Sequence, residues 1–549
     1  MKTKGDIGVI LCRCRGRLAQ RLDLGALKKY FDEIEGVAFV DVEDDLCHDP
    51  DPLKRRRSKG LVIAGCSTKK HIDFFKDTLE RTKIPFFLCE FVDLLGALDP
   101  DPPSSEKTTE LARLIIKAHI EKMHAAFEMA LRVKPTGVKE VMGARKEKVT
   151  RRGFLRLPLM AARMISHYEE IPLFDEKRCI AAQSPCRECI RLCPFEALEI
   201  RNGKIHVLED KCEKCGLCAT VCPVDAVQMP TFSALQALRL VDALADCNFS
   251  VDHRSLVLTC DKGREKMSED TAKFRHSPLN PITVRVPCVA SISSVLFLRC
   301  LELGFDTVIP LCPDASCPKK KAVEAWNERF ESILRVVETL DLRPRPASLT
   351  LDREEVEIAL SDPDSSPSTR NPSGLSFHSR EDMIRILGTL TQDKDLLDIS
   401  IKELPFPFFD IQIDQEKCCL CGACARHCPA GALEIDEGRE PRLRYAAFNC
   451  VGCTKCIELC PEGAVSIHRV MNPSKLKKGV FVTKASDESA RCKNCGKVIG
   501  KKSLLESVNK KLKGSGFEEL AERMYYCQTC KNRVAQQCEE ASRARQDLL

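Results

Sequence analysis

Residues 418–429 read CCLCGACARHCP and residues 450–461 read CVGCTKCIELCP, and these two stretches decide the fold of the segment that contains them. Both contain the spacing CxxCxxCxxxCP. Three thiols on one short loop can reach three corners of a cube, while the proline turns the fourth cysteine toward a second centre. A zinc ion takes four thiolates and leaves no use for two such runs. The spacing therefore predicts a pair of iron–sulfur clusters.

The second cysteine module, residues 406–470, resembles along its whole length the bacterial ferredoxin that carries two 4Fe–4S clusters. The fourth cysteine of each run then ligates the cluster of the other run. One cluster is expected on Cys418, Cys421, Cys424 and Cys460. The other cluster is expected on Cys450, Cys453, Cys456 and Cys428.

The first cysteine module, residues 171–232, repeats this pattern with one departure. The gap after Cys179 is widened and contains Pro185, but a small loop extension costs little closure entropy. One 4Fe–4S cluster is expected on Cys179, Cys186, Cys189 and Cys222. The other is expected on Cys212, Cys215, Cys218 and Cys193. The two modules are an internal duplication.

Cysteine content sets the class of the protein, since the chain has 33 cysteines among 549 residues. Disulfide-dense folds are usually short and secreted, whereas this chain is long and begins without a recognisable leader, so metal binding in the cytoplasm is expected. No long apolar run predicts a membrane span. The net charge of +6 is weak, and one Trp and five Tyr give no basic–aromatic surface for nucleic acid.

The length and patterning predict a multidomain α/β plus α+β chain with two open α/β domains. Strand-like runs at 7–11, 37–42, 61–64 and 85–91 alternate with helical spacing at 24–34 and 73–80, and a long helix is expected at 105–133. The expected order of parts is an α/β domain (1–134), a basic connector (135–170), the first cysteine module (171–232), a second α/β domain (240–345), a partly disordered linker (346–405), the second cysteine module (406–470) and a small tail (488–540).

Strands that end in cysteine mark the domain at 240–345. Cys260, Cys288 and Cys312 each follow a strand-like run, and Cys317 comes five residues after the last of them. Ligands gather at the carboxyl ends of strands in open α/β sheets, although a buried cysteine can also be a small apolar residue. The region resembles the delta subunit of methyl-viologen-reducing hydrogenase. That resemblance implies a 2Fe–2S cluster on Cys260, Cys288, Cys312 and Cys317.

The N-terminal domain repeats this arrangement and is similar to the N-terminal region of the A-type subunit of heterodisulfide reductase. The similarity rests on residues 8–14, 46–50 and 62–67 with His71. It implies a fifth 4Fe–4S cluster on Cys12, Cys14, Cys47 and Cys66. No G-x-G-x-x-G fingerprint follows a strand, so no flavin is expected on this chain.

The tail carries two CxxC pairs, Cys492 with Cys495 and Cys527 with Cys530. They resemble a zinc ribbon, and four thiolates suit tetrahedral zinc. A rubredoxin-type iron site and a further cluster are the alternatives.

These motifs predict a cytoplasmic iron–sulfur electron-transport subunit of an anaerobic oxidoreductase complex, with no catalytic residue of its own. Its expected partners are a hydrogenase or dehydrogenase and a heterodisulfide-reductase-like or flavoprotein subunit. Two alternatives remain at this point: direct reduction of a disulfide at a strand-end cluster, and a regulatory or assembly scaffold whose zinc-ribbon tail binds a partner.

Overall fold

The computed structural model describes a large part of the chain in two compact units. The described residues are 5–46, 48–55, 58–65, 75, 78–79, 84, 88–97, 105–132, 171–245, 255–263, 282–305, 307–312, 317–340, 374–376, 378–391, 401–402, 408–438, 440–472 and 475–532. The first unit comprises 1–179 and 187–395, and the second comprises 180–186 and 396–549. Among the described helices, none is long and apolar enough to cross a membrane.

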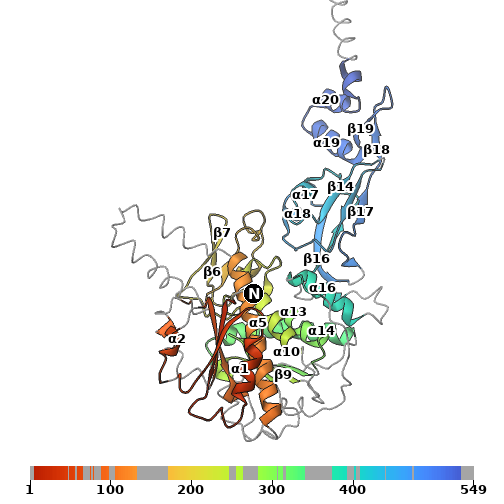
Figure 1. Ribbon diagram of the computed structural model, residues 1–549. Coiled ribbons are helices and arrows are strands. Elements are labelled where there is room, and N and C mark those ends of the chain that lie inside the picture. The colour runs from red at the N-terminus through yellow and green to blue at the C-terminus, as the bar shows by residue number, and fades with distance from the viewer. Residues whose placement is uncertain are drawn as a thin grey trace, which may run out of the picture. The chain divides into compact units, whose positions relative to one another are not determined.

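A parallel sheet in the order β2-β1-β3-β4 forms the centre of the N-terminal domain (Figure 1). Its strands are β1 (Ile7–Cys12), β2 (Val37–Glu43), β3 (Gly60–Gly65) and β4 (Cys89–Asp93). β1 and β3 are buried along their whole length because they occupy the middle of the sheet. The helices of this domain are α1 (Leu24–Asp32), α2 (Pro52–Arg55), α4 (Leu94–Ala97) and α5 (Ser105–Arg132).

The expected strands at 7–11, 37–42 and 61–64 and the helices at 24–34 and 105–133 are confirmed within a few residues. The last strand begins at Cys89 rather than at residue 85. Much of the expected helix at 73–80, and the connector at 135–170, lie outside the described residues.

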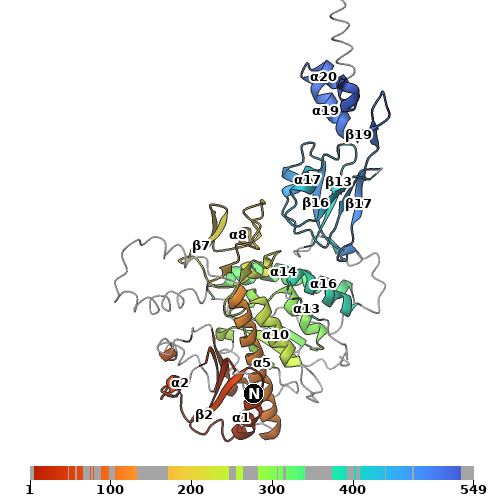
Figure 2. The same cartoon turned by 45° about the horizontal axis from the view of Figure 1, so that its top comes forward.

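The first cysteine module is small and has little regular structure. Its elements are β5 (Leu173–Phe174), α8 (Glu188–Arg191), β6 (Leu198–Arg201), β7 (Lys204–Val207), α9 (Leu217–Val221) and β8 (Val227–Gln228). β5 pairs with β8 and β6 pairs with β7, both antiparallel. The module continues into α10 (Ala234–Ala245), which packs beside α5 (Figure 2).

A second parallel sheet, in the order β10-β9-β11, belongs to the domain at 240–345. Its elements are β9 (Ser255–Thr259), β10 (Ile282–Arg285), η3 (Val289–Ser291), α13 (Ser294–Glu302), β11 (Thr307–Leu311) and α14 (Lys320–Thr339). Trp326 stacks on Phe330 along α14 and donates to the carbonyl of Ile292 at 2.7 Å. This packing fixes the loop that carries Cys288.

A helix occupies part of the range expected to be a linker. α16 (Ser379–Leu390) buries Met383, Ile386, Leu387 and Leu390 and packs on α13. Its first backbone N–H, from Ser379, donates to the carboxylate of Asp225 at 2.8 Å. Residues 341–373 and 392–400 lie outside the described residues.

The second unit contains the second cysteine module and the tail. The module is built from β12 (Ile401–Lys402), β13 (Phe409–Ile413), α17 (Ala423–Arg426), β14 (Leu433–Asp436), β15 (Arg442–Tyr445), α18 (Lys455–Glu458), β16 (Val465–Met471) and β17 (Val482–Ser486). The tail is built from β18 (Ser489–Arg491), β19 (Val498–Lys501), α19 (Lys502–Gly514) and α20 (Glu518–Arg523). Antiparallel pairing of β13 with β16 and of β14 with β15 brackets the two cysteine runs.

Candidate metal centres

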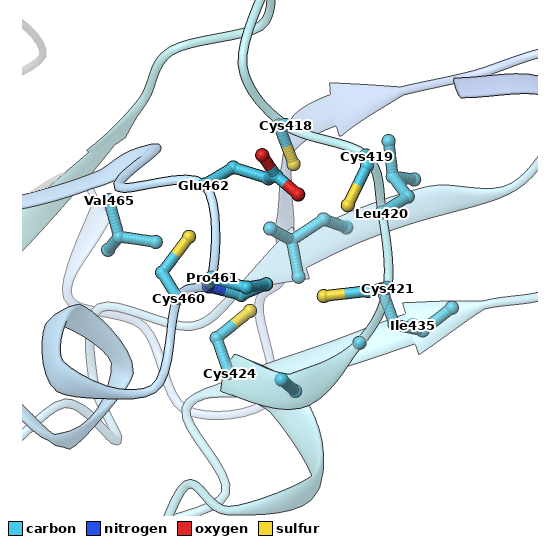
Figure 3. Close-up of a pocket in the computed structure, with 13 residues that line it drawn as sticks. Cys418, Cys419, Leu420, Cys421, Cys424, Ile435, Cys460, Pro461, Glu462 and Val465 are labelled. Carbon is cyan, nitrogen blue, oxygen red and sulfur yellow. The ribbon is translucent and has the colours of Figure 1, made fainter. Parts of the chain in front are cut away.

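Four thiols of the second module line a hollow between its two cysteine runs, the Cys418 hollow. Its cysteines in the predicted set are Cys418, Cys421, Cys424 and Cys460. Figure 3 shows the sulfurs of Cys421 and Cys424 pointing toward a common space, with Cys460 entering from the other run. Burial and the neighbouring thiols Cys418, Cys421 and Cys460 raise the pKa of Cys424 to about 11. Thiolates packed this closely need cations between them, so the donor set fits a cationic iron core.

Apolar side chains close the Cys418 hollow. Ile435, Leu443 and Val465 come from three strands and line it together with Pro461. An apolar shell excludes water and sets the local dielectric, which tunes a cluster's potential.

A second group of four thiols lines the Cys450 hollow, which contains Cys428, Cys450, Cys453 and Cys456. Burial, followed by the charges of Cys450 and Cys453, raises the pKa of the Cys456 thiol to about 12. The geometry thus brings together both predicted sets of the second module, each with its fourth cysteine from the opposite run.

The fourth cysteine of every run receives the same backbone hydrogen bond. The amide four residues further along donates to its sulfur: Ala197 to Cys193 at 3.4 Å, and Ala226 to Cys222, Ala432 to Cys428 and Ala464 to Cys460, each at 3.2 Å. Such donors favour the more negative, reduced state of a cluster. The sequence repeat could have indicated this feature, because a small residue stands at that position each time.

In the first module, one predicted set lines the Cys212 hollow: Cys193, Cys212, Cys215 and Cys218. Burial, together with Cys193 and Cys212, raises the pKa of the Cys215 thiol to about 11. For the other set, Cys189 and Cys222 pack on one small apolar cluster with Phe174, Leu198 and Val227. Cys179 belongs to the first unit and Cys186 to the second, so this set crosses the division between the units and stays a prediction.

The strand-end cysteines of the domain at 240–345 follow parallel strands, as expected. Cys260 comes directly after β9 and Cys312 directly after β11, and Thr259 donates to the carbonyl of Leu311 at 2.8 Å between these strand ends. Burial raises the pKa of Cys288 to about 12, and the charge of Cys312 adds to the shift. Cys288 and Cys312 are buried, while Cys260 and Cys317 are partly exposed.

Half of the predicted N-terminal set is described. Cys12 ends β1, and Cys14 donates its backbone N–H to the Cys12 sulfur at 3.3 Å. A Cβ added to Gly65, the last residue of β3, would lie 3.1 Å from Cys12 Cβ and 3.7 Å from Cys14 Sγ. Cys47 and Cys66 lie outside the described residues, although Cys66 follows Gly65 directly in sequence.

Tail cysteines Cys492, Cys495, Cys527 and Cys530 have sulfurs that all lie within 4.8 Å of one another. The backbone N–H of Cys527 donates to the Cys492 sulfur at 3.3 Å and lowers the pKa of that thiol to about 6. A thiol that ionises this readily is a ready metal ligand, and four thiolates at this separation fit one tetrahedral ion.

One cysteine in the Cys418 hollow was not among the predicted ligands. Cys419 is buried, lines the hollow, and points its sulfur toward the same space as Cys421 (Figure 3). Glu462 lines the hollow as well. The CxxC spacing could not indicate either residue, because neither belongs to the repeat.

Comparison with known proteins first gives the class of each segment. Residues 417–464 match the 4Fe-4S dicluster domain and residues 205–228 match the 4Fe-4S binding domain. Residues 256–353 match the delta subunit of methyl-viologen-reducing hydrogenase. The chain is thus a multidomain iron–sulfur protein with 4Fe–4S ferredoxin domains and a hydrogenase-delta-like domain.

More particular similarity is to the A-type subunits of heterodisulfide reductases. The chain is 22% identical over 262 residues to that of the H(2)/formate:CoB-CoM heterodisulfide,ferredoxin reductase of Methanococcus maripaludis, covering 40% of this chain and 39% of the relative. It is 28% identical over 258 residues to that of the Ferredoxin:CoB-CoM heterodisulfide reductase of Methanosarcina mazei, covering 40% and 32%. An Archaeoglobus profundus protein that is itself described as similar to these A-type subunits is 22% identical over 338 residues, covering 50% and 47%. The chain spans less than half the length of each of these relatives.

Proposed function

We propose that this chain relays single electrons through a series of iron–sulfur centres in a cytoplasmic, anaerobic heterodisulfide-reductase-type or hydrogenase-type complex. The observation that carries the proposal is the pair of hollows in the second module, each lined by three thiols of one cysteine run and the fourth of the other. When bound, the clusters would supply reversible one-electron redox chemistry.

The chain's own residues hold and tune these centres. Four 4Fe–4S clusters would occupy the sixteen module cysteines, a 2Fe–2S cluster would occupy Cys260, Cys288, Cys312 and Cys317, and a fifth 4Fe–4S cluster would occupy Cys12, Cys14, Cys47 and Cys66. The backbone N–H groups that donate to the fourth cysteines would stabilise the reduced state. A zinc-ribbon-like tail would hold a structural zinc on its four cysteines.

The partners would be redox proteins. The similarity to a hydrogenase delta subunit supports a hydrogenase or dehydrogenase as one partner. The similarity to the A-type subunits of heterodisulfide reductases supports a second partner that is heterodisulfide-reductase-like or a flavoprotein, with any flavin on that partner.

Anaerobic iron, sulfide and zinc analysis with electron paramagnetic resonance (EPR) tests the proposal. The expected content is about 22 iron atoms and one zinc per chain, with rapid reduction by a low-potential donor. About 16 iron atoms would keep the ferredoxin modules and remove both strand-end centres. Iron without acid-labile sulfide, or clusters that cannot be reduced, would refute electron relay and favour the scaffold.

A matched pair of variants sharpens the test within one hollow. Cys424→Ser replaces a proposed ligand and should lower the iron content by up to four atoms, whereas Cys419→Ser replaces a neighbouring buried thiol and should leave it unchanged. Equal losses in both variants would contradict the ligand assignment. Turnover of a small disulfide by the isolated, prereduced chain would instead favour direct disulfide reduction.

A further inference from the structure

We propose that electrons pass between the first cysteine module and the strand-end cysteine site through one built junction. Its two sides are the turn Lys214–Gly216 and the segment Cys288–Ser291, and Lys319 holds both. This inference rests on the proposed electron relay, because the junction matters only where both sites hold clusters.

The closest approach across the junction is at Gly216, which lies between Cys215 and Cys218, two proposed ligands in the Cys212 hollow. Gly216 has φ +78°, and a Cβ added there would lie 2.7 Å from Ser291 Cβ and 3.3 Å from Ser291 Cα. Real Cβ atoms do not approach other carbon atoms this closely. The two segments can therefore meet in this way only because residue 216 is glycine.

Ser291 cannot easily move out of this contact. Its hydroxyl donates to the carbonyl of Cys288 at 2.6 Å, and its backbone N–H donates to the same carbonyl at 2.9 Å. Ser291 also ends the short helix η3, which contacts α9 of the module. The position of Ser291 is thus tied directly to the backbone of a proposed ligand of the strand-end site.

Lys319 lies across the two sides. Its Nζ donates to the carbonyl of Lys214 and to the carbonyl of Pro287, each at 3.5 Å. Lys214 directly precedes Cys215, and Pro287 directly precedes Cys288. One ammonium group therefore lies next to a proposed ligand of each centre, where its charge offsets the repulsion between two anionic clusters.

The electrostatics of the thiols agree with this proximity. Burial raises the pKa of Cys288 to about 12, the charge of Cys215 adds to the shift, and Lys319 opposes it. Lys319 also opposes the raised pKa of Cys215. The centre on Cys193, Cys212, Cys215 and Cys218 would therefore be the one of the first module that exchanges electrons with the strand-end site.

The duplicated module supplies a matched control. Gly422 occupies the equivalent position between Cys421 and Cys424, with nearly the same backbone conformation, φ +76°. A Cβ added there would meet Ile435 Cγ1, a side chain of its own module, at 3.3 Å. Alanine at either position carries the same left-handed backbone strain, and only alanine at 216 pushes the junction apart.

The experiment uses the full chain, purified anaerobically with its clusters. In the reduced wild-type protein, the EPR signals of the two centres should broaden each other through spin–spin interaction. Gly216→Ala should remove most of that broadening while iron content stays as in the wild type, and Gly422→Ala should keep it. Adding Ser291→Gly to Gly216→Ala should restore the broadening, because the colliding Cβ is gone.

Lys319→Gln provides a second readout that does not depend on a steric clash. Loss of the cation should make both centres harder to reduce, by about tenfold in the equilibrium constant, or about 59 mV for one electron. The Cys418 and Cys450 centres should keep their potentials.

The junction is wrong if both centres give signals without mutual broadening, if Gly216→Ala and Gly422→Ala change it equally, or if Lys319→Gln shifts neither centre. In those cases the electron relay itself still stands. Absence of any strand-end signal at full ferredoxin iron content would remove the strand-end cluster from the proposed function and the junction with it.

Discussion

Replacing Glu90 by glutamine should loosen the N-terminal sheet, because Glu90 is the only carboxylate that contacts two cations of α5 among the described ion pairs. Its carboxylate lies 2.8 Å from Lys122 Nζ and 3.0 Å from His119 Nδ1. The Lys122 side chain is 9% exposed and the Glu90 side chain 11%. Glutamine keeps the shape of the side chain and leaves the Lys122 ammonium buried without a counterion.

The magnitude follows from the pKa of Glu90. Burial alone would raise this pKa, but the charge of Lys122 and the hydrogen bond with His119 lower it from 4.5 to about 2. A shift of that size corresponds to roughly 3 kcal/mol of folding free energy. Because the folded-state pKa is depressed, this stabilisation is present above about pH 4.5 and is lost as the pH falls toward 2. Breaking a buried pair by removing one partner costs a similar ~3–5 kcal/mol.

Hydrogen exchange measured by mass spectrometry at about pH 7 would locate the effect. About 3 kcal/mol corresponds to roughly a hundredfold loss of protection at the most stable amides of β3, β4 and α5. Asp6→Asn is the control, since Asp6 and Lys59 pair at 2.9 Å with side chains 49% and 70% exposed, and an exposed pair contributes less than ~1 kcal/mol. Exchange of β4 in Glu90→Gln at the rate seen in Asp6→Asn would refute the reasoning.

Three further outcomes are expected. Cys495→Ser should release the proposed zinc and lower the melting temperature of the tail without changing the iron content, which metal analysis and calorimetry would check. Asp225→Ala should cost about 1 kcal/mol more than Asp225→Asn in urea unfolding followed at α16, because only asparagine keeps an acceptor for the Ser379 N–H. Raising the pH through the raised pKa of Asp225, which burial causes, should weaken the wild type by ionising a buried carboxyl, and Asp225→Asn should lack this pH dependence.

Sequence reasoning succeeded where a short period or a fixed spacing carries the structure. The run at 7–11 reads as a buried strand because every residue in it is apolar or glycine, and β1 is buried throughout. The CxxCxxCxxxCP spacing indicated which cysteines line each hollow of the second module, because the loop geometry is local and the proline is part of the pattern.

Sequence reasoning failed where the decisive contact is between distant segments. α16 was predicted as linker, since Ser, Pro and Asp dominate the residues before it, and only its packing on α13 and the bond from Ser379 to Asp225 hold it as a helix. Cys419 looked like a bystander because no spacing includes it, yet it lines the Cys418 hollow. Gly216 is an ordinary motif glycine in the sequence, and only the fold brings Ser291 against it.

The two modules share a motif, but a neighbouring domain approaches the second cysteine loop of the first module and the first cysteine loop of the second. In the first module, the loop of the Cys212 hollow meets Ser291 and Lys319 of the delta-like domain. In the second module, Lys501 of the tail donates to the carbonyl of Leu420 at 2.9 Å, between Cys418 and Cys421. Each module therefore has one centre next to a lysine from a neighbouring domain. Because a nearby cation favours the reduced cluster, this asymmetry would order the potentials within each pair and give a duplicated module a direction.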